Sequence, residues 1–192
     1  TIIDSTKRHY ILMEDLLRQN NIDIPAGFPS SYMSYKADGK SGKSYLKDVL
    51  RLDLETAQRI QREWIENIED EEYLLKDELY PDALKALEDT DGRIVFLTIR
   101  ENEHGLRDEL IRLGIDRYQL IAIPHSDSKS RILESFDDEC VMIGDTEADY
   151  EAANKAGCSY YILNRGFRSK LYWDQRGIES HEDLSELNIK RS

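Results

Sequence analysis

The spacing of the hydrophobic positions changes near residue 80. Before that point, apolar residues recur at steps of three and four, as in Leu54, Ala57, Ile60 and Trp64, which is typical of an amphipathic helix. After it, short apolar runs alternate with helical patterns, and such runs indicate buried parallel strands: 94–97, 120–123, 141–143 and 160–162. The pattern predicts a helical first part followed by an α/β fold with a doubly wound parallel sheet and right-handed crossovers.

The first part of the chain contains one long polar stretch. An amphipathic helix is expected to start after Asp4 or Ser5, either of which would cap it. Residues 21–44 are polar, contain Gly and Pro, and are expected to connect this helix to the next ones. Further helices are predicted over these ranges: 45–50, 54–76, 81–88 and 103–113.

Composition narrows the classes of function. The net charge of −13 argues against a nucleic-acid partner, because binding phosphate backbones needs clusters of Lys and Arg. No apolar run approaches the roughly 20 residues of a membrane helix. Cys140 and Cys158 are isolated, so we expect two small buried thiols in a reducing compartment rather than a disulfide or a zinc site. These features together favour a cytoplasmic protein.

Two carboxylates follow the predicted strand at 141–143. Asp145 comes directly after Gly144, and Asp149 lies in the first turn of the next helix. Oxygen ligands of this kind suit a hard cation such as Mg²⁺. A purely structural alternative is a capping box, in which Thr146 caps the helix and Asp149 pairs with its backbone. The alternative does not explain an Asp at the crevice of a parallel sheet, where open α/β folds bind ligands.

Other polar residues follow neighbouring strands. Thr98 ends the run that begins at Ile94, with Arg100 just beyond it, and Lys129 follows the run that ends at Ile123. The carboxyl ends of parallel strands lie at one edge of the sheet. We therefore expect Thr98, Lys129 and Asp145 to converge on one crevice.

These motifs resemble those of the haloacid dehalogenase-like hydrolase superfamily. Gly144, Asp145 and Asp149, before an Ala- and Gly-containing helix end, resemble the fourth motif of that family. The run ending at Thr98 resembles the second motif, and Lys129 stands in the position of the third. The resemblance implies a Rossmann-like core with an inserted α-helical cap. The core would comprise residues 1–4 and 79–192, and the cap residues 5–78.

The resemblance also implies an activity and roles for residues. It implies a Mg²⁺-dependent phosphatase that hydrolyses a small phosphorylated metabolite through an aspartyl-phosphate. Asp145 and Asp149 would bind the metal, Thr98 would hydrogen-bond the phosphoryl group, and Lys129 would offset its charge. Arg100 is a candidate for binding the substrate's anion. A phosphomutase and a non-catalytic binding protein on the same fold remain alternatives.

The nucleophile of the family is not apparent in this chain. Thr1-Ile2-Ile3-Asp4-Ser5 resembles the tail of the first motif, which begins Asp-x-Asp-Gly-Thr. On this alignment both catalytic aspartates would precede Thr1, and the chain as given is expected to hydrolyse nothing by the family mechanism. The competing alignment makes Asp4 the nucleophile, but three residues are too few for the buried strand that should precede it.

The stretch 36–44 has three interpretations. Ala37 to Ser44 fits a relaxed phosphate-loop pattern, which would make the protein a nucleotide-dependent kinase if a strand preceded it. A flexible turn before a helix is the plain structural alternative. Lys36, Gly39 and Ser41 also resemble a Lys-x-x-Gly-x-Ser element of some caps in the family, which would bind substrate. On that basis we expect a mobile loop that faces the crevice.

Overall fold

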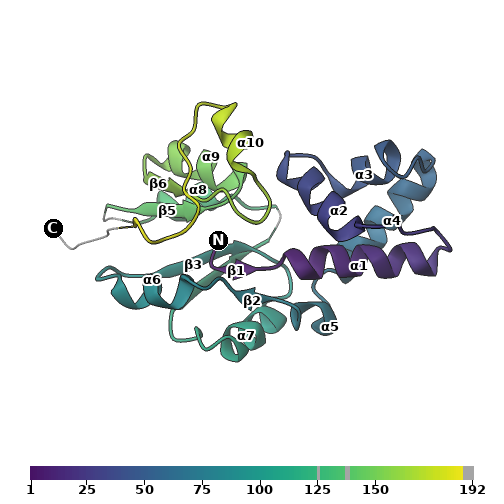
Figure 1. The fold of residues 1–192 in the computed structure, drawn as a ribbon. Coiled ribbons are helices and arrows are strands. Elements are labelled where there is room, and N and C mark those ends of the chain that lie inside the picture. The colour runs from purple at the N-terminus through teal and green to yellow at the C-terminus, as the bar shows by residue number, and fades with distance from the viewer. Residues whose placement is uncertain (125, 137–138, 188–192) are drawn as a thin grey trace.

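The structure is a computed structural model that describes residues 1–124, 126–136 and 139–187. Its first part is helical and its second part alternates strands with helices (Figure 1). The helices of the first part are α1 (Thr6–Gln19), α2 (Phe28–Ala37), α3 (Gly42–Asp48), α4 (Leu54–Asn67) and α5 (Glu71–Leu74). Among the described residues, no helix is long and apolar enough to cross a membrane.

The five helices α1–α5 form a bundle with its own hydrophobic cluster. Leu12, Leu16, Phe28, Tyr45 and Ile60 are fully buried within it. Two expectations for this part were wrong. The supposed connection contains helix α2, because Phe28 and Tyr32, one turn apart, are both buried. The helix expected over 54–76 is interrupted after Asn67, and α5 begins at Glu71.

The residues that the structure describes form three two-stranded sheets. An antiparallel pair joins β1 (Ile3–Asp4) to β2 (Glu78–Leu79). Parallel pairs join β3 (Val95–Ile99) to β4 (Gln119–Ile123) and β5 (Val141–Gly144) to β6 (Ser159–Ile162). The helices of the second part are α6 (Ala83–Asp89), α7 (Glu103–Arg112), α8 (Lys129–Leu133), α9 (Glu147–Ala156) and α10 (Lys170–Asp174). Mixed α/β architecture with parallel strands is thus confirmed.

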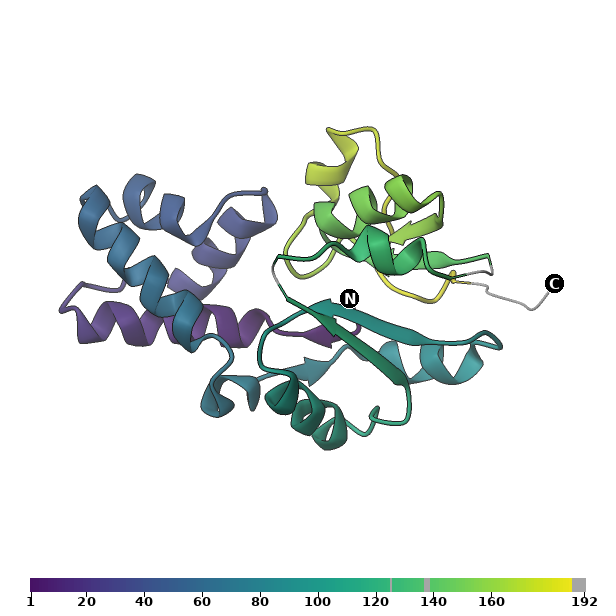
Figure 2. The same ribbon diagram turned by 180° about the vertical axis from the view of Figure 1, so that it is seen from behind.

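A cavity separates the two parallel pairs. It has a volume of about 1080 Å³ and is lined by residues of both β3 and β5. The two strands make no ladder with each other, so each pair keeps one unpaired edge on the cavity side. Thr1 also lines the cavity, and the N-terminus lies between the two pairs in both views (Figures 1 and 2). The single sheet that the sequence pattern predicts is therefore divided in two.

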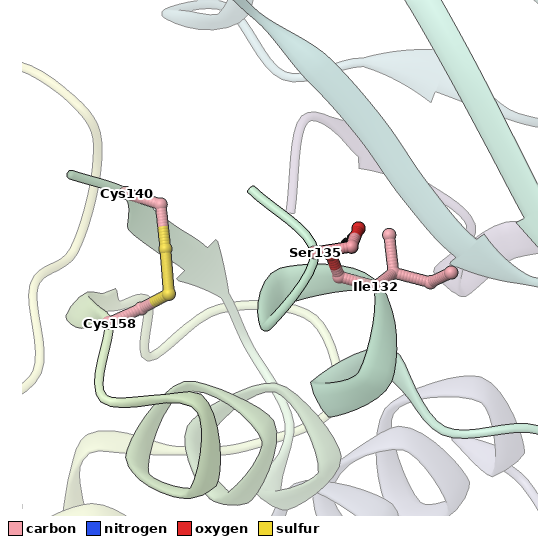
Figure 3. The surroundings of a disulfide bond; sticks show 4 residues. All are labelled: Ile132, Ser135, Cys140 and Cys158. Carbon is pink, nitrogen blue, oxygen red and sulfur yellow. Dashed lines mark hydrogen bonds between the residues drawn. A yellow bond between two sulfur atoms is a disulfide. The ribbon is translucent and has the colours of Figure 1, made fainter. Parts of the chain in front are cut away.

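Cys140 and Cys158 form a disulfide (Figure 3). The expectation of two free thiols was wrong. The cause is the parallel register, which places Val141 opposite Ser159 and so brings the residue before each strand face to face. Their Cα atoms are 5.3 Å apart, which is within the usual range for a disulfide.

Candidate active site

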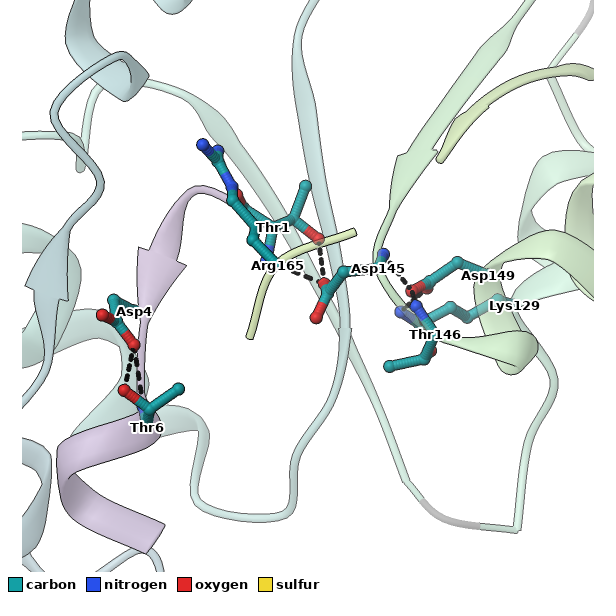
Figure 4. Close-up of polar contacts among 8 residues, drawn as sticks. All are labelled: Thr1, Asp4, Thr6, Lys129, Asp145, Thr146, Asp149 and Arg165. Carbon is teal, nitrogen blue, oxygen red and sulfur yellow. Dashed lines mark hydrogen bonds and ion pairs between the residues drawn. The ribbon is translucent and has the colours of Figure 1, made fainter. Parts of the chain in front are cut away.

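The start of α9 places two carboxylates at the carboxyl end of β5 (Figure 4). Oδ2 of Asp149 accepts hydrogen bonds from the backbone N–H groups of Asp145 and Thr146, both at 3.2 Å, and from Oγ1 of Thr146 at 2.8 Å. The capping box that the sequence predicts is therefore present. Because this cap uses Oδ2, the other oxygen of Asp149, Oδ1, is left to accept a hydrogen bond from Nζ of Lys129.

Gly144 permits this arrangement. A Cβ atom added at Gly144 would lie 2.2 Å from Cβ of Asp149 and 2.6 Å from its Oδ2. Real Cβ atoms do not approach so closely, and a core does not accommodate such overlap without strain. Glycine at this position therefore lets the Asp149 carboxylate fold back over the end of the strand.

Gly144→Ala is expected to destabilise the protein by about 1–3 kcal/mol, the usual cost of overpacking. The clash is with a single side chain, so most of this cost should disappear when Asp149 is replaced by glycine. Urea unfolding of the two single variants and the double variant forms a thermodynamic cycle that measures the difference. An equal cost of Gly144→Ala in both backgrounds would contradict the packing described here.

Lys129 is the first residue of α8 and reaches the same turn. Ser128 caps this helix by accepting a hydrogen bond from the N–H of Ser130 at 3.3 Å. Nζ of Lys129 lies 2.6 Å from Oδ1 of Asp149, and both side chains are largely buried. A charge-assisted contact of this length is among the stronger hydrogen bonds in proteins.

Asp145 is buried at the end of β5, and its side chain is bound by Thr1, the first residue of the chain. Its Oδ1 accepts hydrogen bonds from the α-amino group and Oγ1 of Thr1, both at 2.8 Å. Burial alone raises the pKa of Asp145, but the Thr1 ammonium, the hydrogen bonds from Thr1 and the Lys129 charge outweigh it and lower the pKa. Asp145 is therefore a carboxylate at neutral pH. Its Oδ2 makes no hydrogen bond with the residues that the structure describes.

Several residues singled out from the sequence line one cavity: Thr98, Arg100, Lys129, Asp145 and Asp149. Thr98 lies near the end of β3, opposite Ala122 of β4. Arg100 differs from the others because its guanidinium is engaged with other residues. It lies 2.5 Å from Oε2 of Glu109 and 3.9 Å from Oδ2 of Asp77.

None of residues 36–44 lines this cavity. Lys36 ends in the bundle, where its Nζ lies 2.7 Å from Nδ1 of His9. Gly39 lies against Tyr172 of α10. Ser41 caps α3 in a capping box with Ser44. The expected loop is thus the end of α2, a short turn and the start of α3. Because a helix precedes it, the strand required by the kinase alternative is missing.

Two arginines near the site were missed from the sequence. Arg165 donates to the carbonyl of Thr1 at 2.7 Å and forms a bidentate pair with Asp82 at 2.7 and 2.9 Å. Arg168 pairs with Glu147, in the first turn of α9, at 2.7 Å. The motif around Asn164–Phe167 resembles a family loop, but no pattern in the sequence links these arginines to their distant partners.

The site has the oxygen donors that Mg²⁺ prefers. Within the described ranges, no three His, Cys, Asp or Glu side chains form a group that could hold a metal ion. Mg²⁺ in phosphate-binding sites, however, commonly takes only one or two carboxylates and completes its shell with water and phosphate oxygens. The Oδ2 atom of Asp145 fits this requirement, and Asp149 is the adjacent carboxylate.

Comparison with known proteins agrees with this geometry. Residues 1–157 match the family of haloacid dehalogenase-like hydrolases, and no curated protein matches the chain. One similar solved structure is a candidate phosphoglycolate phosphatase from Lactobacillus delbrueckii subsp. bulgaricus, with 14% identity, TM-score 0.70 and coverage of 97% of this chain and 92% of that one. A predicted phosphatase from Clostridium acetobutylicum has 16% identity, TM-score 0.68 and coverage of 97% and 91%.

A third similar structure, Protein Tyrosine Kinase A of Mycobacterium tuberculosis, has 17% identity, TM-score 0.66 and coverage of 97% and 91%. Identities this low show the fold alone, and fold does not fix the reaction. The family match covers most of the chain, so the protein belongs to the haloacid dehalogenase-like hydrolases.

Proposed function

We propose that the protein is a Mg²⁺-dependent phosphatase of a small phosphorylated metabolite. One observation carries the proposal: Thr98, Lys129, Asp145 and Asp149 come from three separate segments and line a single cavity, near the carboxyl ends of β3 and β5. A cation, two carboxylates and a hydroxyl gathered there suit the handling of a phosphoryl group. The family to which the chain belongs is one of hydrolases.

Each residue has a distinct role in this proposal. Burial raises the pKa of Asp145, and the hydrogen bond from Oγ1 of Thr1 and the Lys129 charge oppose that effect even when Thr1 no longer carries an ammonium group. Asp145 would hold Mg²⁺ together with Asp149. The bound metal would supply Lewis-acid stabilisation of charge on phosphate oxygens. Lys129, already 2.6 Å from Asp149, would place its ammonium beside the same oxygens, and Thr98 would donate a hydrogen bond to them. These groups are fixed before substrate arrives, which is what makes electrostatic stabilisation effective.

The divided sheet supports a specific source for the nucleophile. The cavity between β3 and β5 is flanked by two unpaired strand edges and has Thr1 at its mouth, in contact with Asp145. One more parallel strand, leading directly into Thr1, would join the two pairs into one sheet and fill the cavity. We propose that this strand carries Asp-x-Asp-Gly and that its first aspartate is the nucleophile. Attack would form an aspartyl-phosphate and break the P–O ester bond, and water would then release phosphate.

The α1–α5 bundle would act as a cap over this site. It has its own hydrophobic cluster and joins the α/β part through two short connections, near Asp4 and near Asp77. Cytoplasmic location stays a proposal that rests on the family. The Cys140–Cys158 disulfide is a feature more often found in oxidising compartments.

The test is to extend the chain. The extended protein carries four or five apolar residues followed by Asp-x-Asp-Gly ahead of Thr1. We expect it to release phosphate from an aryl phosphate in the presence of Mg²⁺. The release should stop when a chelator is added. The matched control carries Asn-x-Asn-Gly in the same extension. Turnover by the control as fast as by the Asp-x-Asp-Gly protein would overturn the proposed nucleophile.

A folded extended protein that is silent on a broad panel of phosphorylated metabolites would overturn the phosphatase proposal. It would favour the alternative of a binding protein on the same fold.

A further inference from the structure

The loop that follows β6 carries an arginine that reaches the first residue of the chain. Nη1 of Arg165 donates to both carboxylate oxygens of Asp82, at 2.7 and 2.9 Å, and Nη2 donates to the carbonyl of Thr1 at 2.7 Å. The guanidinium also lies over the ring of Tyr80, 4.0 Å from its centre. Only 12% of the Arg165 side chain is exposed. Segments that are distant in the sequence therefore meet at this one side chain.

Asp82 is itself held in place by a second partner. Its Oδ2 accepts a hydrogen bond from the N–H of Leu184 at 2.7 Å, in addition to the bond from Arg165. A planar guanidinium in a bidentate pair with a carboxylate has a fixed orientation. Arg165 is therefore directed toward Thr1, and the position of the Thr1 carbonyl is set by a rigid partner.

Thr1 in turn binds the carboxylate that we assign to the metal. Its Oγ1 donates to Oδ1 of Asp145 at 2.8 Å (Figure 4). Arg165 is thus two contacts away from Asp145, because it holds the carbonyl of Thr1 while the Thr1 side chain holds one oxygen of Asp145. In the extended protein the α-amino group of Thr1 becomes a peptide N–H, whereas Oγ1 stays available for the same bond.

The residue after Arg165 leaves room for the second oxygen of Asp145. Gly166 has a φ of +73°, and a Cβ atom there would lie 3.3 Å from Oδ2 of Asp145 and 3.3 Å from the hydroxyl oxygen of Tyr80. Gly166 is among the residues that line the cavity, whereas Arg165 is not. The loop therefore borders Asp145 directly at Gly166 and acts on it indirectly through Arg165 and Thr1.

We propose that Arg165 is a positioning residue of the active site, which fixes Thr1 so that Thr1 keeps the Asp145 carboxylate oriented with Oδ2 free for the metal. This assignment rests on the proposed function, because that function gives Asp145 its metal. Arg165 does not line the cavity and takes no part in bond breaking. In the extended protein Thr1 directly follows Asp-x-Asp-Gly, so the contact that fixes Thr1 also fixes the end of that segment relative to Asp145.

A purely structural role of Arg165 predicts a different result. The Arg165–Asp82 pair joins the loop after β6 to the residue before α6. If it did no more than that, its loss would lower stability without changing the turnover of molecules that stay folded. A positioning role lowers turnover itself, since a misplacement of about 1 Å in an active site costs up to about a hundredfold in rate.

In the extended protein, Arg165→Met is expected to lower kcat for an aryl phosphate by about ten- to a hundredfold. KM should change by less than about twofold, because Arg165 does not contact the substrate, and the apparent affinity for Mg²⁺ should weaken. Arg165→Lys should restore less than about a third of the lost kcat, because an ammonium group cannot bind the Asp82 carboxylate bidentately and reach the Thr1 carbonyl as well. Steady-state kinetics well below the unfolding transition measure these values.

Ile115→Ala is the control for loss of stability alone. Ile115 is fully buried in the cluster that contains Leu110 of α7, and it is not among the residues that line the cavity. Its substitution leaves a cavity in the core, yet kcat should stay within about twofold of the wild type. A fall of kcat in Arg165→Met no larger than in Ile115→Ala would overturn the positioning role, and so would full activity in Arg165→Lys.

The chain as given tests the same link without turnover. The N–H of Tyr80 donates to the carbonyl of Ile2 at 3.0 Å and so reports how firmly the N-terminal segment is held. The N–H of Ile115, which donates to the carbonyl of Leu110 at 3.0 Å, is the reference within the core. In Arg165→Met, protection of the Tyr80 N–H against solvent exchange, measured by NMR, is expected to fall at least about tenfold more than that of Ile115.

The exchange measurement separates this inference from the proposed reaction. A silent extended wild type would count against the phosphatase and not against Arg165. In that case a greater fall in protection at Tyr80 than at Ile115 would still support the link from Arg165 to the N-terminal segment, and an equal fall would overturn it. If Arg165→Met does not fold, Arg165→Lys, which keeps the charge, carries both measurements.

Discussion

Replacing Asp145 by asparagine in the extended protein is expected to lower kcat/KM for an aryl phosphate by about a hundredfold or more, as for loss of a main electrostatic group. Asparagine keeps the shape but removes the charge, and Asp145 is a buried carboxylate that lines the cavity and has an oxygen free of hydrogen bonds to the described residues. Steady-state kinetics over a range of Mg²⁺ concentrations should show both a weaker apparent metal affinity and a lower rate at saturating metal.

Asp4→Asn is the matched control for that experiment. Oδ1 of Asp4 accepts hydrogen bonds from the N–H of Thr6 at 2.9 Å and from its Oγ1 at 2.6 Å, at the start of α1 (Figure 4). Asparagine keeps a side-chain oxygen that can accept both bonds, so activity should change by less than about threefold. Turnover that survives Asp145→Asn and is lost in Asp4→Asn would show that Asp4 is the nucleophile after all.

The local part of the site was predictable from the sequence. The β5–α9 turn depends on neighbours in the chain: an apolar run, Gly144 for close approach, and Thr146 with Asp149 for the cap. The place of Lys129 was expected from its order after the run ending at Ile123 and from the resemblance to the third motif. Local signals of this kind do not require knowledge of the tertiary fold.

The missed features all depend on distant pairings. The disulfide arises from the β5–β6 register, and the ion pair of Arg165 with Asp82 joins residues that are far apart in the sequence. Helix α2 was not predicted, because its buried face is formed by Phe28 and Tyr32 within an otherwise polar segment. Arg100 seemed available for substrate because its partners, Asp77 and Glu109, are not adjacent in any sequence pattern. Tertiary context decided each of these cases.

The second large expected effect is on the stability of the protein. It concerns a buried cluster of charged residues at the connection near Asp77. Nη2 of Arg8, in α1, lies 3.3 Å from Oδ2 of Asp77, which Arg100 also approaches, and Arg100 pairs with Glu109 of α7. The side chains of Asp77 and Glu109 are fully buried. Neither oxygen of Asp77 has a hydrogen bond with the described residues. The Arg8 charge is therefore the main compensation for burying this carboxyl group.

Burial raises the pKa of Asp77 to about 8, so at pH values above this Arg8→Met is expected to destabilise the protein by about 3–5 kcal/mol, the usual cost of removing one partner of a buried ion pair. Burial raises the pKa of Asp77, the Arg8 charge lowers it, and nearby Glu109 raises it again. When Asp77 is protonated, losing Arg8 costs little charge energy, and when it is ionised the loss costs most. The destabilisation should therefore grow as pH rises through neutrality.

Urea unfolding at acid and alkaline pH measures both the size and the slope of this effect. Lys7→Met is a matched control one residue away, because the Lys7–Glu78 pair is exposed although its atoms, at 2.7 Å, lie closer than those of the Arg8–Asp77 pair. Exposed pairs contribute about 0–1 kcal/mol. Adding Asp77→Leu to Arg8→Met should recover much of the lost stability, since an apolar pair leaves no buried charge uncompensated. A loss in Arg8→Met no greater than in Lys7→Met, or one that does not change with pH, would show that Asp77 does not depend on Arg8.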